Sequence, residues 1–133
     1  MSSNSFTKIK EYFDANFDLM RHLDINACWE YIVTENNLNE QVKYHFFLIK
    51  KAESRVSFTT MDPELKPDLI LYFTEKAILT LIEGEPTTEE YYKRYRYLMN
   101  NPQLGIELDS KINKPRFTLL KIGYRSWQRD FKF

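Results

Sequence analysis

Two histidines and one cysteine are the side chains of this sequence best suited to proton transfer or nucleophilic attack. His22, Cys28 and His45 are too far apart along the chain to form a short-spaced zinc motif. A nucleophile also needs a base within hydrogen-bond reach. His22 falls near the end of an amphipathic segment, where it can contact helix-terminal carbonyl groups, and His45 falls in a predicted strand. Either could act in catalysis, but we expect structural or solvent-facing roles for both.

Phosphate-binding and hydrolase motifs are absent. The three glycines, at positions 84, 105 and 123, form no P-loop, dinucleotide fingerprint or nucleophile elbow. We therefore expect no catalytic residue, no metal and no cofactor, and we expect that the protein is not an enzyme. A small enzyme that uses paired carboxylates remains an alternative, because catalytic carboxylates leave no local signature.

The elements that would position any site begin with an amphipathic helix over 6–23. Its apolar residues recur at steps of three and four, namely Phe6, Ile9, Phe13, Phe17 and Met20. Ser5 is the expected N-cap, and residues 1–5 are expected to be loose.

Five strands are predicted after this helix. Alternation of apolar and polar residues indicates strands over 28–34, 42–50, 54–60 and 104–112, and a second helix remains an alternative for 28–34. The stretch 68–73 is continuously apolar and is predicted to be a central strand covered on both faces.

Three further helices complete the prediction. The first follows a Thr74 cap and ends at Gly84, and the second opens with the capping-box spacing of Thr87 and Glu90 and runs to about Met99. The last has an apolar stripe at steps of three and four, in which Gly123 lies off the stripe: Phe117, Leu120, Tyr124, Trp127 and Phe131.

Length and composition favour one α+β domain over residues 1–133. The chain has 133 residues, of which 43% are hydrophobic and 16% aromatic. A single cysteine allows no intrachain disulfide, no signal peptide is visible, and no stretch is long enough to span a bilayer. These features predict a cytoplasmic protein.

Charge is distributed unevenly although the net charge is zero. Residues 53–90 carry nine acidic and three basic side chains, whereas residues 111–133 carry seven basic and one acidic. The basic C-terminal segment could meet phosphates or anionic head groups. The two segments could instead neutralise one another within the fold or across a dimer.

One stretch resembles the sterol carrier protein type-2 (SCP2-like) family. It runs Asp68-Leu69-Ile70-Leu71-Tyr72-Phe73-Thr74 and continues as Glu75-Lys76-Ala77-Ile78-Leu79-Thr80-Leu81-Ile82-Glu83-Gly84. An aspartate opens a strand, a Thr caps the next helix, and a glycine closes it. The stretch Gly105-Ile106-Glu107-Leu108-Asp109-Ser110 keeps the first glycine of the family's following strand and lacks the last.

The resemblance implies a single, mainly antiparallel sheet of about five strands with helices packed on one face. It also implies a tunnel between sheet and helices for an apolar small molecule or lipid, such as a fatty acyl or sterol-like molecule. The expected walls are Phe46, Phe58, Ile70, Tyr72, Ile78, Leu81, Ile82, Tyr95, Met99, Leu120, Tyr124 and Trp127. Arg125 and Arg129 are the expected head-group contacts.

Two other functions remain open. Exposed tyrosines could form the interface of a homodimer or of a complex with a protein partner, around a tightly packed aromatic core without ligand. Lys93, Arg94 and Arg96 alternate with tyrosines, a pattern that single-stranded nucleic-acid surfaces use. The neutral net charge argues against nucleic acid.

Overall fold

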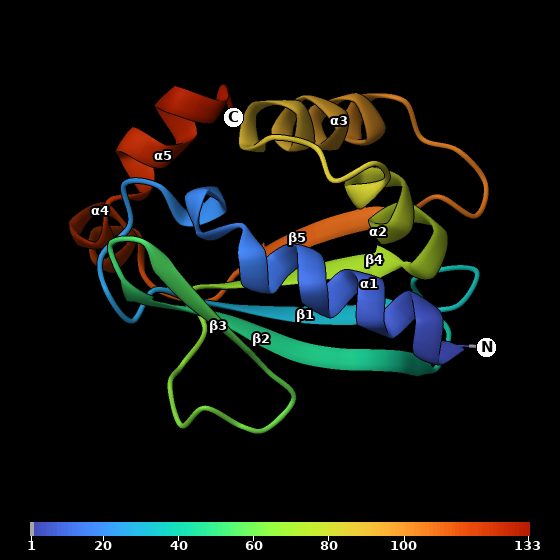
Figure 1. Ribbon diagram of the computed structural model, residues 1–133. Coiled ribbons are helices and arrows are strands. Elements are labelled where there is room, and N and C mark those ends of the chain that lie inside the picture. Colours follow the sequence, from blue (N-terminus) through green and yellow to red (C-terminus); the bar gives the residue numbers. More distant parts are fainter. Residues whose placement is uncertain (1) are drawn as a thin grey trace.

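The computed structural model describes residues 2–133, which form five α-helices, one 3₁₀ helix and one five-stranded sheet (Figure 1). The elements are, in chain order, α1 (Ser2–Ala15), η1 (Phe17–Met20), β1 (Cys28–Thr34), β2 (Val42–Ala52), β3 (Arg55–Thr59), β4 (Leu69–Thr74), α2 (Glu75–Ile82), α3 (Thr88–Asn100), β5 (Leu108–Ile112), α4 (Arg116–Ile122) and α5 (Tyr124–Phe131).

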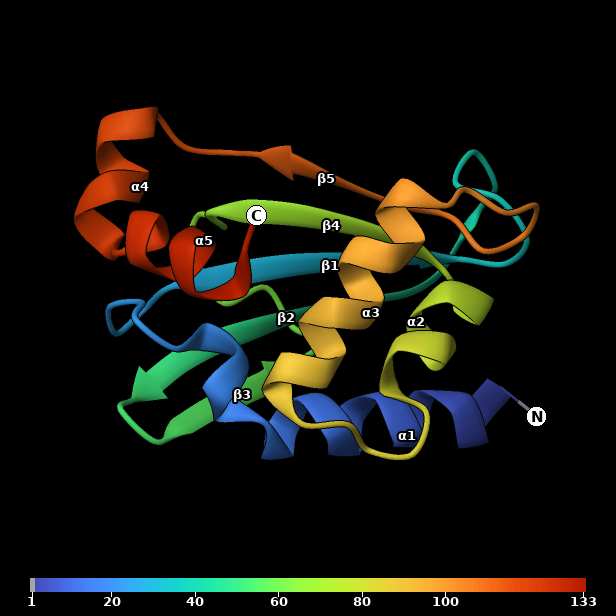
Figure 2. The ribbon, with the colours of Figure 1, turned by 90° about the horizontal axis from the view of Figure 1, so that it is seen from above.

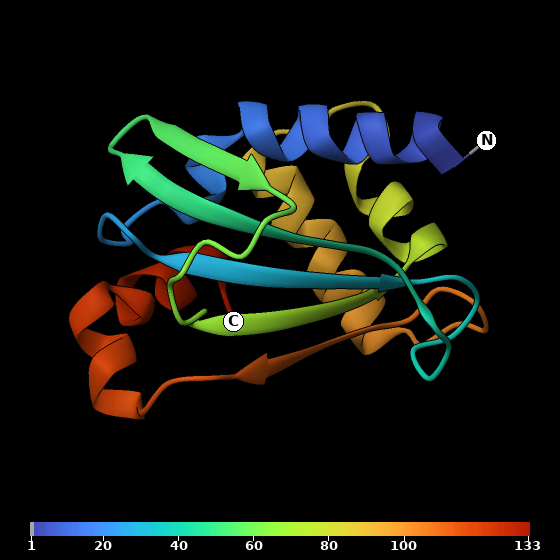
Figure 3. The ribbon, with the colours of Figure 1, turned by 90° about the horizontal axis from the view of Figure 1, so that it is seen from below.

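The sheet has the strand order β3-β2-β1-β4-β5. β1 and β4 are parallel, and the other three neighbouring pairs are antiparallel. Helices α1, α2, α3 and α5 cover one face, whereas the opposite face carries, among the described residues, only the loop between β3 and β4 (Figures 1 and 3). The predicted α+β class and mainly antiparallel sheet are thus confirmed. Within residues 2–133, no helix is long and apolar enough to cross a membrane.

Helix α1 differs from the prediction at both ends. It begins at Ser2, so residues 2–5 are helical and Ser5 is not the N-cap; Met1 lies outside the described residues. It stops at Ala15 because Asn16 leaves the helical conformation, with φ −112° and ψ 65°. The Asn16 side chain donates a hydrogen bond of 2.6 Å to the carbonyl oxygen of Tyr12. This local bond competes with the helix ladder, and a short 3₁₀ turn follows.

Strand β4 was predicted to be covered on both faces, and that prediction is wrong. Leu71 and Phe73 are buried beneath the helices, but Ile70 and Tyr72 are only half-buried on the other face. On that face the loop residue Leu65 packs against a small separate cluster that consists of Cys28, Phe47 and Ile49.

Strand β5 is shorter than predicted. It begins at Leu108, and Leu104, which the alternation placed in the strand, is 99% exposed. Alternation over a short segment does not by itself make a strand, because a strand also needs a neighbouring strand to pair with. Here β4 pairs with β5 from Leu108 to Ile112.

The last predicted helix is two helices. Gly123 has φ 112°, ends α4 and begins α5. A β-carbon at this position would lie 2.1 Å from the carbonyl oxygen of His22, so only glycine allows the two backbones to approach this closely. The bend takes Phe117 and Leu120 out to solvent, where they are 79% and 43% exposed, and leaves Tyr124 buried.

We expect Gly123→Ala to lower the free energy of unfolding by at least about 2 kcal/mol, because it adds the clash with His22 to the cost of a positive φ. Gly105→Ala is the matched control. Gly105 also has a positive φ, of 83°, but no atom lies within 4 Å of the added carbon. The control should lose only about 1 kcal/mol in urea denaturation. Equal losses would show that the close approach to His22 does not matter.

Candidate functional site

Two rows of side chains on the covered face of the sheet form the floor of a cavity. Trp29, Leu69 and Ile112 are register partners across β1, β4 and β5. Tyr31, Leu71 and Ser110 form the next row. Side chains two residues apart on a strand point to the same face, so the two rows lie side by side. The parallel pairing of β1 with β4 creates this arrangement.

Helices α3 and α5 supply the walls. The α3 residues are Tyr91, Tyr92, Tyr95 and Met99, and the C-terminal residues are Trp127, Gln128 and Phe133. Figure 2 shows α3 and α5 side by side above the strands. The cavity has a volume of about 240 Å³. Its lining contains aromatic, aliphatic and neutral polar side chains only.

Stacked rings fix the wall on the α5 side. Tyr92 stacks on Phe131 with centroids 4.3 Å apart, and Trp127 stacks on Phe133 at 5.2 Å. Phe133 also meets the edge of Tyr95 at 5.7 Å. Such ring pairs add to the stabilisation from burial, so the wall is held by mutual packing.

The polar atoms of these rings are bonded within the protein. The carbonyl oxygen of Leu19 in η1 accepts hydrogen bonds from the Tyr92 hydroxyl at 2.7 Å and from Trp127 Nε1 at 3.1 Å. Trp29 Nε1 donates to the Tyr124 hydroxyl at 2.8 Å, and that hydroxyl donates to Asp68 Oδ2 at 2.7 Å. These bonds position Trp29, Tyr92 and Trp127 around the cavity.

Asp68 is fully buried at the base of this network. Its Oδ2 also accepts a hydrogen bond of 3.1 Å from the backbone N–H of Cys28. Its Oδ1 has no geometrically favourable hydrogen bond, but it lies 2.6 Å from Lys114 Nζ. We regard this oxygen as partnered by the lysine charge, since a buried carboxylate needs a nearby cation.

The Tyr31 hydroxyl, in the floor of the cavity, is the exception among the polar groups of the lining. Tyr31 is fully buried, and in the described part of the chain its phenol oxygen has no hydrogen-bond partner. Burial is the main cause that raises the pKa of Tyr31 well above its usual value, and the nearby Tyr92 adds to the effect. The phenol is therefore a neutral donor that no protein atom satisfies, which costs stability.

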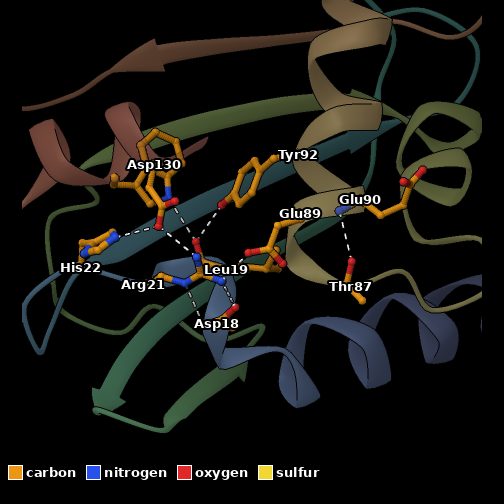
Figure 4. A network of polar contacts seen from close by, with 10 residues as sticks. Asp18, Leu19, Arg21, His22, Thr87, Glu89, Glu90, Tyr92 and Asp130 are labelled. Carbon is orange, nitrogen blue, oxygen red and sulfur yellow. Dashed lines mark hydrogen bonds and ion pairs between the residues drawn. The ribbon is translucent and has the colours of Figure 1, made fainter. Parts of the chain in front are cut away.

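An ion cluster beside the cavity holds α5 against η1 and α3 (Figure 4). Arg21 pairs with Asp18, with Glu89 at 2.7 Å and with Asp130 at 2.9 Å. Hydrogen bonds that Arg21 donates, first to the Asp18 carboxylate, raise the pKa of Arg21, whereas His22 and then Arg21 lower the pKa of Asp130. Asp130 lies on α5, so these contacts help to close the wall.

The predicted site residues divide into groups. Tyr95, Met99 and Trp127 line the cavity, and Tyr124 lies buried behind Trp29. The buried core away from the cavity contains Phe46, Phe58, Ile78, Leu81 and Ile82.

The other predicted residues lie outside the covered interior. Ile70 and Tyr72 are on the opposite face of the sheet, because they alternate with the inward-facing Leu71. Leu120 is exposed as a result of the bend at Gly123. Arg125 and Arg129 are exposed on α5 and do not line the cavity.

Several lining residues were not predicted. They are Trp29, Tyr31, Leu69, Leu71, Tyr91, Tyr92, Ser110, Ile112, Gln128 and Phe133. The alternation of 28–34 already placed Trp29 and Tyr31 on one side of a strand. Only the unpredicted pairing of β1 with β4 brings Leu69 and Leu71 beside them.

The other reactive side chains have structural surroundings. His22 Nε2 lies 2.8 Å from Asp130, and His45 Nε2 lies 2.6 Å from Glu30. Burial raises the pKa of the Cys28 thiol to about 12, which leaves it unreactive at neutral pH. In residues 2–133, no group of three His, Cys, Asp or Glu side chains could hold a metal ion.

We expect Asp68→Asn to lower the free energy of unfolding by about 3 kcal/mol, because it removes one partner of a buried ion pair. Chemical denaturation measures the loss. Asp14→Asn, on the exposed side of α1, changes the same functional group and should have little effect. Similar stability of the two variants would contradict the role given to Asp68.

The buried tyrosines predict loss of stability at alkaline pH. Burial raises the pKa of Tyr12 to about 12 and that of Tyr91 and Tyr92 well above the usual value. The unfolded chain ionises these phenols near pH ~10, so their contribution to stability is complete below that pH and is lost above it. Phenolate absorbance should rise together with loss of circular dichroism. Ionisation near pH ~10 in a chain that stays folded would contradict this.

Comparisons with known proteins give structural neighbours only. No protein-family model matches this sequence, and no curated protein matches it. A solved structure described as "UbiJ-SCP2 Ubiquinone synthesis protein" is similar over 94% of this chain and 90% of its own, with 7% identity and a TM-score of 0.43.

Two further solved structures come from named organisms. Sterol Carrier Protein 2 from Yarrowia lipolytica in its apo form is similar over 78% of this chain and 75% of its own, with 14% identity and a TM-score of 0.41. The sterol carrier protein domain 2 of Helicoverpa armigera is similar over 97% of this chain and 85% of its own, with 12% identity and a TM-score of 0.41. These solved structures are SCP2 domains, the family that the stretch from Asp68 to Gly84 resembles.

Proposed function

We propose that this protein binds an apolar or amphiphilic small molecule, of the lipid, fatty acyl or sterol-like class, in the cavity between α3, α5 and the sheet, without catalysis. The observation that carries the proposal is a cavity lined by aromatic and aliphatic side chains, with one unpartnered buried phenol among them, that of Tyr31. Ligand sites have this character, since they are mostly apolar with a few polar groups that orient the ligand.

The size of the cavity limits what it can enclose. Its volume of about 240 Å³ is below the roughly 300–1,000 Å³ of typical small-molecule pockets. A small molecule, or one end of a longer chain that leaves through the opening, fits this volume. Met99 and Phe133 are 50% and 40% exposed although both line the cavity, so the opening lies beside them.

The unpartnered phenol specifies part of the ligand. Its raised pKa keeps the buried Tyr31 phenol protonated, so it is a hydrogen-bond donor for a ligand oxygen that reaches it. A hydroxyl, carbonyl or carboxyl group would therefore be preferred over a pure hydrocarbon. Ser110 and Gln128 supply additional neutral polar groups in the lining.

The composition of the lining supports binding without reaction. It contains no His, Cys, Asp, Glu, Lys or Arg side chain, so no base in the lining could activate the Ser110 hydroxyl as a nucleophile. Asp68 is the nearest buried acid in the network, and Tyr124 and Lys114 already engage it.

Both tryptophans of the chain line the cavity, so intrinsic fluorescence reports on binding directly. We expect the emission of Trp29 and Trp127 to change in a saturable manner when oleic acid is added. Native mass spectrometry of the purified protein should also show a bound lipid or acyl species. Unchanged emission together with a mass that no added fatty acid or fatty alcohol alters would refute the proposal.

Tyr31→Phe tests the role of the unpartnered phenol. It should weaken oleic acid binding by about 1 kcal/mol and leave the ligand-free protein as stable or more stable, because a buried unsatisfied group is removed. Tyr12→Phe is the matched control, since the Tyr12 hydroxyl is outside the cavity and donates to the carbonyl oxygen of Pro86 at 3.0 Å. The control should reduce stability and leave binding unchanged. If Tyr31→Phe left oleic acid binding unchanged and Tyr12→Phe weakened it, Tyr31 would be excluded as a ligand contact.

A further inference from the structure

Helix α4 presents an unusual outward face. Leu119 is its buried residue, and Phe117 lies on the opposite side at 79% exposure. With about 100° between successive residues, Phe117 and Leu120 lie roughly 60° apart at the centre of the outward face, with Arg116 and Lys121 roughly 40° beyond them on either side. An apolar centre flanked by two cations therefore faces solvent.

Four exposed side chains make up this outward face. We name it the α4 patch and define it as Arg116, Phe117, Leu120 and Lys121. Exposed large apolar side chains that cluster in this way commonly mark an interaction site.

The cations of the C-terminal segment are not neutralised within the fold. In residues 2–133, the one ion pair between the acidic segment 53–90 and the basic segment 111–133 joins Asp68 to Lys114. The exposed cations Lys111, Arg116, Lys121, Arg125, Arg129 and Lys132 have no carboxylate partner within that range. Internal neutralisation, one of the two explanations considered for the uneven charge, is therefore minor.

We propose that the α4 patch docks on the surface of an anionic lipid bilayer. Aromatic and aliphatic side chains enter the boundary between head groups and acyl chains, while flanking Lys and Arg side chains attract anionic head groups. Phe117 and Leu120 would insert, and Arg116 and Lys121 would lie at head-group level. This proposal does not require the cavity to hold a ligand.

The chain leads from the cavity floor directly to the α4 patch. Ile112, which lines the cavity in the row with Trp29 and Leu69, is 66% exposed and precedes the first residue of α4 by four positions.

A nucleic-acid surface fits these residues less well. Base stacking needs exposed rings, but three of the four tyrosines of α3, Tyr91, Tyr92 and Tyr95, are buried, and Tyr97 alone of the four is exposed. The α3 arginines are also occupied within the fold: Arg94 bonds to Glu90 and to the carbonyl oxygen of Glu83, and Arg96 bonds to that of Phe131. At the α4 patch, Phe117 is the one ring, and Leu120 beside it offers no stacking surface to a base and suits lipid.

Vesicle flotation of the full chain tests the proposal. We expect binding to vesicles of equal parts phosphatidylserine and phosphatidylcholine, weak binding to phosphatidylcholine alone, and weaker binding in raised salt. The double variant Arg116→Glu/Lys121→Glu should bind at least about 25-fold less tightly, at about fivefold for each lost cation. Phe117→Ser/Leu120→Ser should lose about tenfold.

The matched control is Lys66→Glu/Lys76→Glu, which changes net charge equally at two exposed lysines of the acidic segment. It should retain vesicle binding, and Tyr31→Phe should also retain it, which separates this proposal from ligand binding. All altered side chains of the α4 patch are exposed, so melting temperatures should not change.

Equal losses of vesicle binding in the patch and control variants, or no binding to anionic vesicles, would overturn the proposal. Patch-dependent binding to a single-stranded oligonucleotide or patch-dependent dimerisation in place of vesicle binding would also overturn it.

Discussion

A buried carboxylate holds this fold together at the point where its parts meet. Asp68 fixes the start of β1 through the N–H of Cys28, the last helix through the Tyr124 hydroxyl, and the link between β5 and α4 through Lys114. Its backbone N–H donates to Cys28 and its carbonyl oxygen accepts from Asn113, so the main chain repeats the same connections. A charge removed from water must be paired, so Tyr124 has to lie where its hydroxyl can reach Asp68, and this fixes the position of α5. The cavity walls depend on the position of α5, because Trp127 and Gln128 of this helix line the cavity.

Features that rest on local chemistry were predictable from the sequence. The alternation over 28–34 gives β1, and the caps at Thr74 and Thr87 each accept a hydrogen bond from a backbone N–H three residues later. Features that depend on distant contacts were not. Helical periodicity could not detect that α4 and α5 separate at Gly123, because the reason for the break is the backbone of His22, a hundred residues earlier.

The candidate site shows the same division. Tyr95 and Trp127 were predicted because helical spacing gives the inward face of a helix directly. Phe46 and Phe58 lie in the core away from this cavity, which could not be predicted because strand alternation gives an inward face without saying which helix covers it. Here α1 covers the edge of the sheet formed by β2 and β3. Tyr31 was placed on the correct face, but its lack of a hydrogen-bond partner is visible only when all neighbouring groups are known.

The parallel pairing of β1 with β4 also governs how the chain folds. β1, β2 and β3 follow one another as an antiparallel meander, whose contacts are local along the chain. The residues of β1 and β4 that pair, by contrast, are 40 positions apart, as are Cys28 and Asp68. The entropy of closing that long loop must be overcome before the pairing gives any stabilisation, so the central step of folding is slow compared with hairpin formation. Until it occurs, the edge of β1 is open to strands of other chains, and aggregation competes with folding at that stage.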